Sequence, residues 1–294
     1  MVLEYLYPLK LIERNPLYAF LLGFGYSVIG IGAALLLFPE DPTIVAIAFI
    51  AIMFYPTINA LMKEEEELES EKEESSFFSF FTDHKSIFKV YALAFLGILL
   101  AFSFFSMVLP SIASNYIFQS QLSVLYGNAG TTGGAIFNVP LLKSLLSNNF
   151  SVMILAFLTA FLLGDGAIFL LAWNASVWGT IFGTIAKNAA VKGAAVSWAV
   201  CKTPANCFLI VMLIVFMHMI IEAFAYMCAA TAGGTVSKAV LKERFFSIRF
   251  KNLAFNTILL IVFALVVLAI GALVETSVLV NSDTYRLIIR QSFL

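Results

Sequence analysis

Four polar residues interrupt long apolar stretches of the sequence and could do chemistry there. Asp165 stands between two glycines in LLGDGAIFLL, Asn174 follows in AWNASVWG, and His218 and Glu222 lie in VFMHMIIEAFAYM. Ionisable side chains inside an apolar helix usually face a bundle interior or a water-filled cavity and have a partner. His218 and Glu222 are four residues apart, so on a helix they share a face and are predicted to pair. The sequence therefore predicts a buried polar site at these four positions.

This predicted site has two interpretations. In the first, Asp165, His218 and Glu222 form a proton or cation relay, or a ligand site. In the second, they only hold helices together, with Asp165 stabilising a kink. The sequence has no HExxH motif, and these residues supply no specific set of nucleophile, base and orienting group. We therefore expect neither enzyme activity nor a cofactor.

The cysteines are too few for a metal cluster of the usual kind. The sequence has only three cysteines and two histidines that could bind a metal such as zinc, so no metal site is expected. Cys201 and Cys207 flank the short segment KTPAN. If that segment lies outside the cell, a disulfide between them is the favoured interpretation and free thiols are the second. Cys228 lies in an apolar stretch and is expected to be a small core residue.

The composition indicates whether these residues lie in a water-soluble protein or in a membrane protein. Of the 294 residues, 61% are hydrophobic and only 12% are charged, and the mean hydropathy is +0.97. Soluble domains carry about 25% charged residues. A net charge of -1 offers no broad basic surface for nucleic acid. The sequence predicts an all-α polytopic integral membrane bundle, surrounded by membrane lipids.

Seven stretches are long and apolar enough to cross a bilayer, which needs about 20 residues. They are Leu17–Phe38, Thr43–Met62, Phe88–Leu109, Val152–Trp173, Ala175–Val200, Cys207–Thr231 and Leu253–Glu275. The fifth contains Lys187 and Lys192, so we expect it to be broken or re-entrant near Lys187 to Gly193. The densest basic cluster, residues 237–251, is expected in the cytoplasm. Seven crossings then place the N-terminus in the cytoplasm and the C-terminus outside the cell membrane.

The polar segments divide the chain into four parts. Residues 1–62 are predicted to form a two-span hairpin, 63–87 an acidic linker and interfacial segment, 88–280 a five-span membrane domain, and 281–294 a tail. The acidic run KEEEELESEKEESS is expected to be a solvated spacer or a helical extension. Residues 110–150 are expected to form a long outer loop, and loops of that length are usually functional or disordered. We expect protein partners to dock there.

The motif GTIFG, residues 179–183, has the spacing of small residues that lets helices approach closely. Within a compact bundle, contact inside the chain is favoured over a dimer interface. A homo-oligomer is the alternative.

Two runs carry a resemblance to a known family. These are NNFSVMILAFLTAFLLGDGAIFLLAWNASVWG, residues 148–179, and HMIIEAFAYMCAATAGG, residues 218–234. They resemble the stage II sporulation protein M family, in its archaeal branch, whose features are an asparagine-led span, an Asn-Gly or Asn-Ala-Ser turn and a His-Gly-x-x-Glu helix that ends in glycines. The resemblance covers roughly residues 77–280 and excludes the N-terminal hairpin. It departs at Met219, where the family has glycine.

The resemblance implies the membrane domain and not a particular role. The leading functional hypothesis is a non-enzymatic membrane scaffold or assembly factor that docks partners through the outer loop. The alternative is a transporter or channel in which Asp165, His218 and Glu222 line a proton or cation pathway.

Overall fold

A computed structural model describes residues 12, 15–40, 42–70, 85–127, 139–163, 167–242 and 247–293. These residues form helices and contain no strand. The helices are α2 (Leu17–Leu37), α3 (Pro42–Ser70), α5 (Lys85–Val108), α6 (Ser111–Ile117), α7 (Gln119–Gly127), α8 (Val139–Leu163), α9 (Ala167–Gly193), α10 (Pro204–Lys242), α11 (Ile248–Asn281) and α12 (Asp283–Phe293).

Seven helices of the described chain are long and apolar enough to cross a membrane: α2, α3, α5, α8, α9, α10 and α11. Many of their large apolar side chains point away from the bundle, as Leu36, Leu162 and Leu213 do. A helix satisfies its backbone polar groups internally, which is what a span through hydrocarbon requires. The prediction of an all-α multi-pass membrane bundle with seven spans is confirmed.

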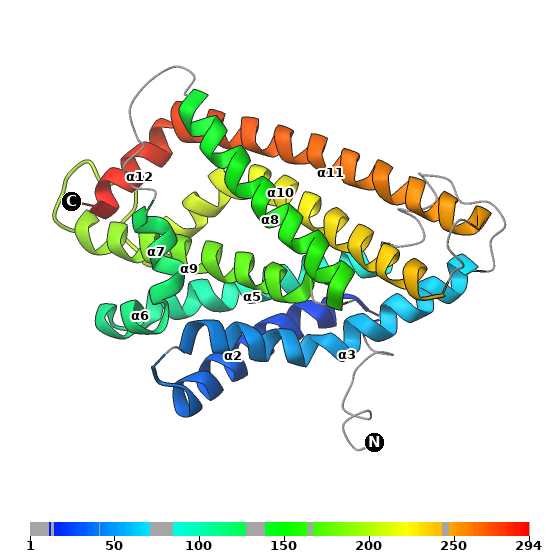
Figure 1. Ribbon diagram of the computed structural model, residues 1–294. Helices are drawn as coiled ribbons and strands as arrows, with labels where there is room; N and C mark the ends of the chain where they lie inside the picture. The colour runs from blue at the N-terminus through cyan, green and yellow to red at the C-terminus, as the bar shows by residue number, and fades with distance from the viewer. Residues whose placement is uncertain are drawn as a thin grey trace.

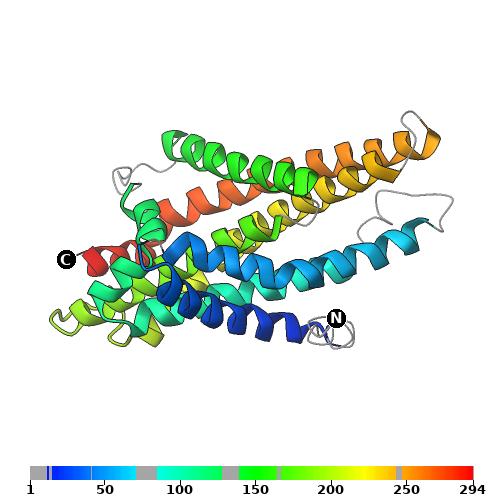
Figure 2. The same cartoon turned by 60° about the horizontal axis from the view of Figure 1, so that its bottom comes forward.

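The spans pack in layers around α5 and α9 (Figure 1). Helices α2 and α3 pack on one side of these two, while α8, α10 and α11 pack together on the other. Helices α6, α7 and α12 gather at one end of the bundle, opposite the start of α2 (Figure 2). We call this the α12 end.

Close packing of α5 and α9 depends on two glycines. A Cβ atom at Gly179 would clash with the carbonyl oxygen of Leu99, and one at Gly183 would lie 2.6 Å from that of Ser103. Only hydrogen at these positions lets the two backbones meet. The expected internal role of GTIFG is confirmed.

The boundary between the fourth and fifth spans was predicted wrongly. Helix α8 ends at Leu163 and α9 begins at Ala167, whereas the prediction ran the fourth span on to Trp173. Glycine and aspartate disfavour helix interiors, and the sequence Gly-Asp-Gly falls in this interval. Asn174, predicted to close a span, therefore lies inside α9. Asp165 lies outside the described residues.

The predicted break near Lys187 is also wrong, because α9 is one helix to Gly193. The two lysines of α9 donate hydrogen bonds to carbonyl groups at the ends of other helices. Lys187 Nζ donates to the carbonyl of Leu109, just after α5. Lys192 Nζ donates to the carbonyl of Ser292, in the last turn of α12, at 3.1 Å. Cations are stabilised at helix C-termini, so these lysines need no break in their own helix.

Much of the predicted outer loop, residues 110–150, is helical. It contains α6, α7 and the first turns of α8, while residues 128–138 lie outside the described chain. Phe118 and Gln121 are buried. Gln121 Nε2 donates to Ser176 Oγ of α9 at 3.2 Å. The segment up to Gly127 is thus folded onto the bundle and is not a free loop.

Two other linking segments are helical as well. The acidic run begins as the continuation of α3, which extends to Ser70, and residues 71–84 lie outside the described chain. The C-terminal tail contains the amphipathic helix α12, which packs on α9. The side chain of Gln291 holds this contact: its Nε2 donates to the carbonyl of Cys201 at 2.8 Å, and its Oε1 accepts from Val200 N at 3.0 Å.

The turn between α9 and α10 carries a disulfide. Cys201 and Cys207 are bonded, with their Cα atoms 5.3 Å apart. Cys228 is a free, buried thiol on α10. The disulfide therefore closes the same turn that Gln291 anchors to α12.

Substitution of Gly183 should destabilise the fold. Gly183→Ala forces a methyl group against backbone and should lower the free energy of unfolding by about 1–3 kcal/mol. Gly32→Ala is the matched control, because a Cβ there meets nothing within 4 Å. Thermal unfolding in detergent measures both, and equal stability of the two variants would contradict the packing.

The turn at the α12 end should be oxidised in the native protein. Peptide mapping without reductant should recover Cys201 joined to Cys207, because the disulfide joins them locally. Alkylated thiols at both positions, with Cys228 as the internal marker of a free thiol, would contradict the bond.

Candidate functional site

Two glutamates from different helices lie together inside the bundle. Glu222 lies near the middle of α10 and is 2% exposed. Its carboxyl group interacts with the carboxyl group of Glu275 on α11 and with the side-chain amide of Asn149 on α8. We call Glu222 and Glu275 the carboxyl pair. Three helices therefore contribute to one polar site.

Gly271 explains how α11 approaches α10 at this point. A Cβ atom at Gly271 would lie 2.9 Å from Cγ of Glu222. Glu275 follows one helical turn later, on the same face of α11. The missing side chain at Gly271 thus brings the backbone of α11 against Glu222 and presents Glu275 beside it.

Polar atoms at the site lack hydrogen-bond partners. They are Glu222 Oε1, Glu275 Oε2 and Asn149 Nδ2, all shielded from solvent, and Asn149 as a whole is 6% exposed. A buried polar group without a partner costs about 1–3 kcal/mol. The site therefore buries polar atoms at a cost in stability.

If both glutamates of the carboxyl pair are ionised, they need a positive charge beside them. Two ionised carboxylates that are held next to each other away from water repel each other strongly. Within the described part of the chain, no lysine or arginine is among the groups acting on either glutamate. A proton or a bound cation between the carboxyl groups would remove the repulsion.

Two tyrosines border the pair. Tyr226 lies one turn beyond Glu222 on α10, is fully buried, and interacts with both glutamates. Tyr285 on α12 lies towards Glu275: burial raises the pKa of Tyr285 to about 12, and the charge of Glu275 adds to this effect. Tyr285 therefore keeps its proton at neutral pH and presents a neutral hydroxyl group.

The structure does not pair His218 with Glu222 as predicted. His218 is buried on α10, but no hydrogen bond or ion pair joins these two described residues, and His218 Nδ1 has no hydrogen-bond partner. Sharing a helix face brings two side chains near each other and does not by itself make them meet. Glu222 points instead to groups on α8 and α11.

The other predicted site residues are not brought to the pair. Asn174 Nδ2 donates to the carbonyl of Leu170 in its own helix at 2.9 Å, so its amide donor is satisfied there. Asp165 lies outside the described residues. The sequence prediction missed Glu275 and Asn149. Their signal was present, because both are polar residues within or beside apolar stretches, but they stand near the ends of their spans.

A metal site of the usual kind is not found in the described ranges, where no cluster of three or more His, Cys, Asp or Glu side chains occurs. The carboxyl pair supplies two such side chains. Its remaining neighbours are amide and phenol groups.

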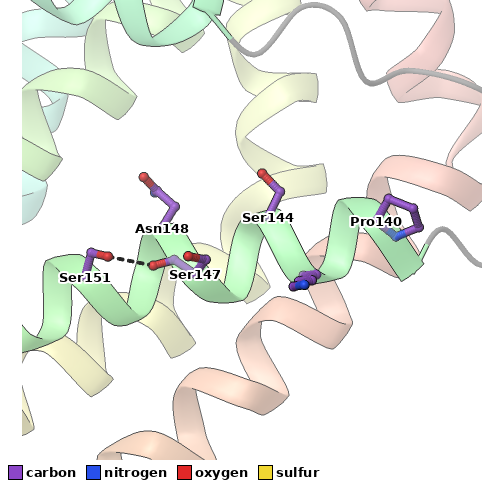
Figure 3. A pocket seen from close by; sticks show the side chains of 6 residues that line it. Pro140, Ser144, Ser147, Asn148 and Ser151 are labelled. Atoms are coloured by element: carbon purple, nitrogen blue, oxygen red, sulfur yellow. Dashed lines mark hydrogen bonds between the residues drawn. The ribbon is translucent and has the colours of Figure 1, made fainter.

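A shallow, open pocket lies along one side of α8 (Figure 3). Its lining residues are Pro140, Lys143, Ser144, Ser147, Asn148 and Ser151. Asn148 Nδ2 donates to Asn149 Oδ1 at 3.3 Å. The exposed Asn148 and the buried Asn149 therefore connect this pocket with the carboxyl pair.

Comparison with known proteins adds no relative. No protein-family model, curated protein or solved structure matches the chain. The resemblance to the stage II sporulation protein M family therefore stays a prediction, and the site must be interpreted from its own chemistry.

A double-mutant cycle distinguishes the two partners of Glu222. Glu222→Gln and Glu275→Gln should be coupled by at least about 1 kcal/mol in unfolding free energy, because either change alone relieves the same repulsion. Glu222→Gln and His218→Gln should be additive within about 0.5 kcal/mol. Thermal unfolding in detergent provides the measurement. A larger coupling to His218 than to Glu275 would contradict the site.

Proposed function

We propose that the chain is a membrane transport protein that moves protons or a small cation by way of Glu222 and Glu275. One observation carries the proposal: two carboxyl groups from different helices lie side by side in a membrane bundle, with unpartnered oxygens and no basic partner in the described chain. Ionisable residues buried inside a membrane bundle are costly and usually mark ion or proton pathways.

The carboxyl pair can bind and release a positively charged species reversibly. An ionised pair attracts a positive species, and binding removes the repulsion between the carboxylates. Because Gly271 of α11 lies directly against the side chain of Glu222, a change in the charge of the pair acts on the packing of α10 against α11. A cycle of binding and release can therefore be linked to a change in helix packing.

A purely structural role is the competing interpretation. In it, one proton shared by the carboxyl groups holds α10 to α11 permanently, and nothing is transported. The membrane scaffold hypothesis also stays a prediction. It depended on a long outer loop, and α6 and α7 leave less of that segment free for a partner.

We propose further that the chain resides in the cell membrane with the α12 end outside. The basic cluster at residues 237–251 supports this orientation, since cytoplasmic loops collect lysine and arginine. The disulfide at the α12 end also supports it, because disulfides persist in oxidising compartments.

Flux through reconstituted protein tests the proposal. Liposomes that enclose a pH-sensitive dye should show protein-dependent proton movement, or cation-driven pH change, under an imposed gradient. Glu222→Gln and Glu275→Gln should each reduce the rate at least about tenfold, because glutamine keeps the shape and loses the exchangeable charge.

Asp283→Asn is the matched control, because it is the same chemical change at an exposed carboxylate on α12, 3.2 Å from Arg286. Its flux should equal that of the unchanged protein. Absence of flux for protons and for a panel of monovalent and divalent cations would contradict transport and favour the structural role.

A further inference from the structure

One face of α8 changes from polar to apolar along its length. The pocket residues follow one another at intervals of three and four, so they form a stripe along one side of the helix. Its polar members are exposed, and they are Lys143, Ser144, Ser147, Asn148 and Ser151. We call them the α8 polar stripe. The same face continues with the exposed Leu155, Leu158 and Leu162.

The stripe extends as deep as the carboxyl pair. Asn149, which interacts with Glu222, lies between its members Asn148 and Ser151. The first turns of α8 lie at the end of the bundle where α11 meets α12 (Figure 2). The stripe therefore leads from the α12 end to the level of the pair, and the apolar part of the face begins beyond it.

Hydrocarbon is a poor environment for such a face. Polar and charged side chains that lie at membrane depth usually face protein or a water-filled cavity. Between Ser147 and Ser151 the structure shows only a hydrogen bond to the helix backbone, from Ser151 Oγ to Ser147 O at 2.8 Å (Figure 3). The outward sides of these groups are available to water.

A pair of side-chain amides joins the stripe to the site. Exposed Asn148 donates to Asn149 Oδ1, and the Nδ2 atom of Asn149, buried and without a hydrogen-bond partner, belongs to the amide that interacts with Glu222. The buried Asn149 therefore lies between the exposed stripe and Glu222.

We infer that the α8 polar stripe is the water-lined entrance by which a proton reaches Glu222 and Glu275 from the α12 end. This inference rests on the proposed function and names its substrate. Lys143 places a positive charge on the stripe, and the stripe has no carboxylate to replace the hydration shell of a metal cation. A proton crosses such a path on water molecules.

The chemical step is a simple transfer. A hydronium ion donates one proton to a carboxylate oxygen of the pair, which becomes a carboxylic acid, and a water molecule is left behind. The side-chain amides line the path and keep their own protons. Release reverses the step.

Chemical labelling of the pair tests this entrance without measuring transport. In open membrane fragments carrying Cys228→Ala, a water-soluble carbodiimide with an added amine should label Glu222 or Glu275, read by mass spectrometry. Prior reaction of Ser147→Cys with a bulky charged thiol reagent should slow that labelling at least tenfold, because the reagent fills the entrance.

Two further cysteine variants are controls for the effect of modified Ser147→Cys. Asn115→Cys on α6, which is exposed away from the stripe, should react with the thiol reagent and leave the labelling rate unchanged. Leu158→Cys, on the apolar part of the α8 face, should resist the charged reagent although Leu158 is 41% exposed.

The outcomes separate the inference from the proposed function. Labelling that is slowed only by modified Ser147→Cys supports the entrance, even if reconstituted protein shows no flux. The inference is overturned if the pair is not labelled in the unblocked protein, if modified Ser147→Cys leaves the rate unchanged, or if Ser147→Cys does not react with the reagent.

Discussion

The close approach of α10 and α11 at Gly271 is the constraint on which the site depends. A Cβ atom at this position would press against the side chain of Glu222, so glycine lets the face of α11 that carries Glu275 lie directly on Glu222. The contact forces two acidic groups into one buried space. Their repulsion must then be compensated by a proton or a cation, and this requirement links the packing of the bundle to its chemistry.

Hydrophobic length was enough to predict the spans, because each crossing needs its own run of apolar residues. The basic cluster at residues 237–251 was enough to count seven of them rather than six. The predicted helix boundaries were wrong at residues whose type is compatible with two different structural roles. Lys187 suggested a broken helix. Its ammonium group instead donates to the carbonyl of Leu109 at the end of α5, and no residue near Lys187 in the sequence identifies that distant acceptor. Gly-Asp-Gly suggested a polar interruption inside a span, whereas α8 ends at Leu163 and α9 begins at Ala167.

The candidate site was predicted only in part for a similar reason. Spacing along one helix identified His218 and Glu222 as residues on a shared face, but the direction of each side chain depends on neighbouring helices. Asn149 and Glu275 come from spans far away in the sequence, and their depth in the bundle follows from how α8 and α11 cross α10. Helix crossing is decided by small residues such as Gly233, which faces Phe157 of α8, and Gly271. Sequence periodicity does not show which helix each glycine meets.

The chemistry of the site depends on a positive charge that the two glutamates of the carboxyl pair share. Infrared spectroscopy of the purified protein at neutral pH, without added metal, measures this most directly, because a protonated carboxyl group absorbs apart from a carboxylate. We expect a protonated carboxyl band that is lost or shifted in Glu222→Gln and also in Glu275→Gln, and is unchanged in Asp283→Asn. A spectrum with no protonated carboxyl group, or a band that only one of the two glutamates affects, would contradict it.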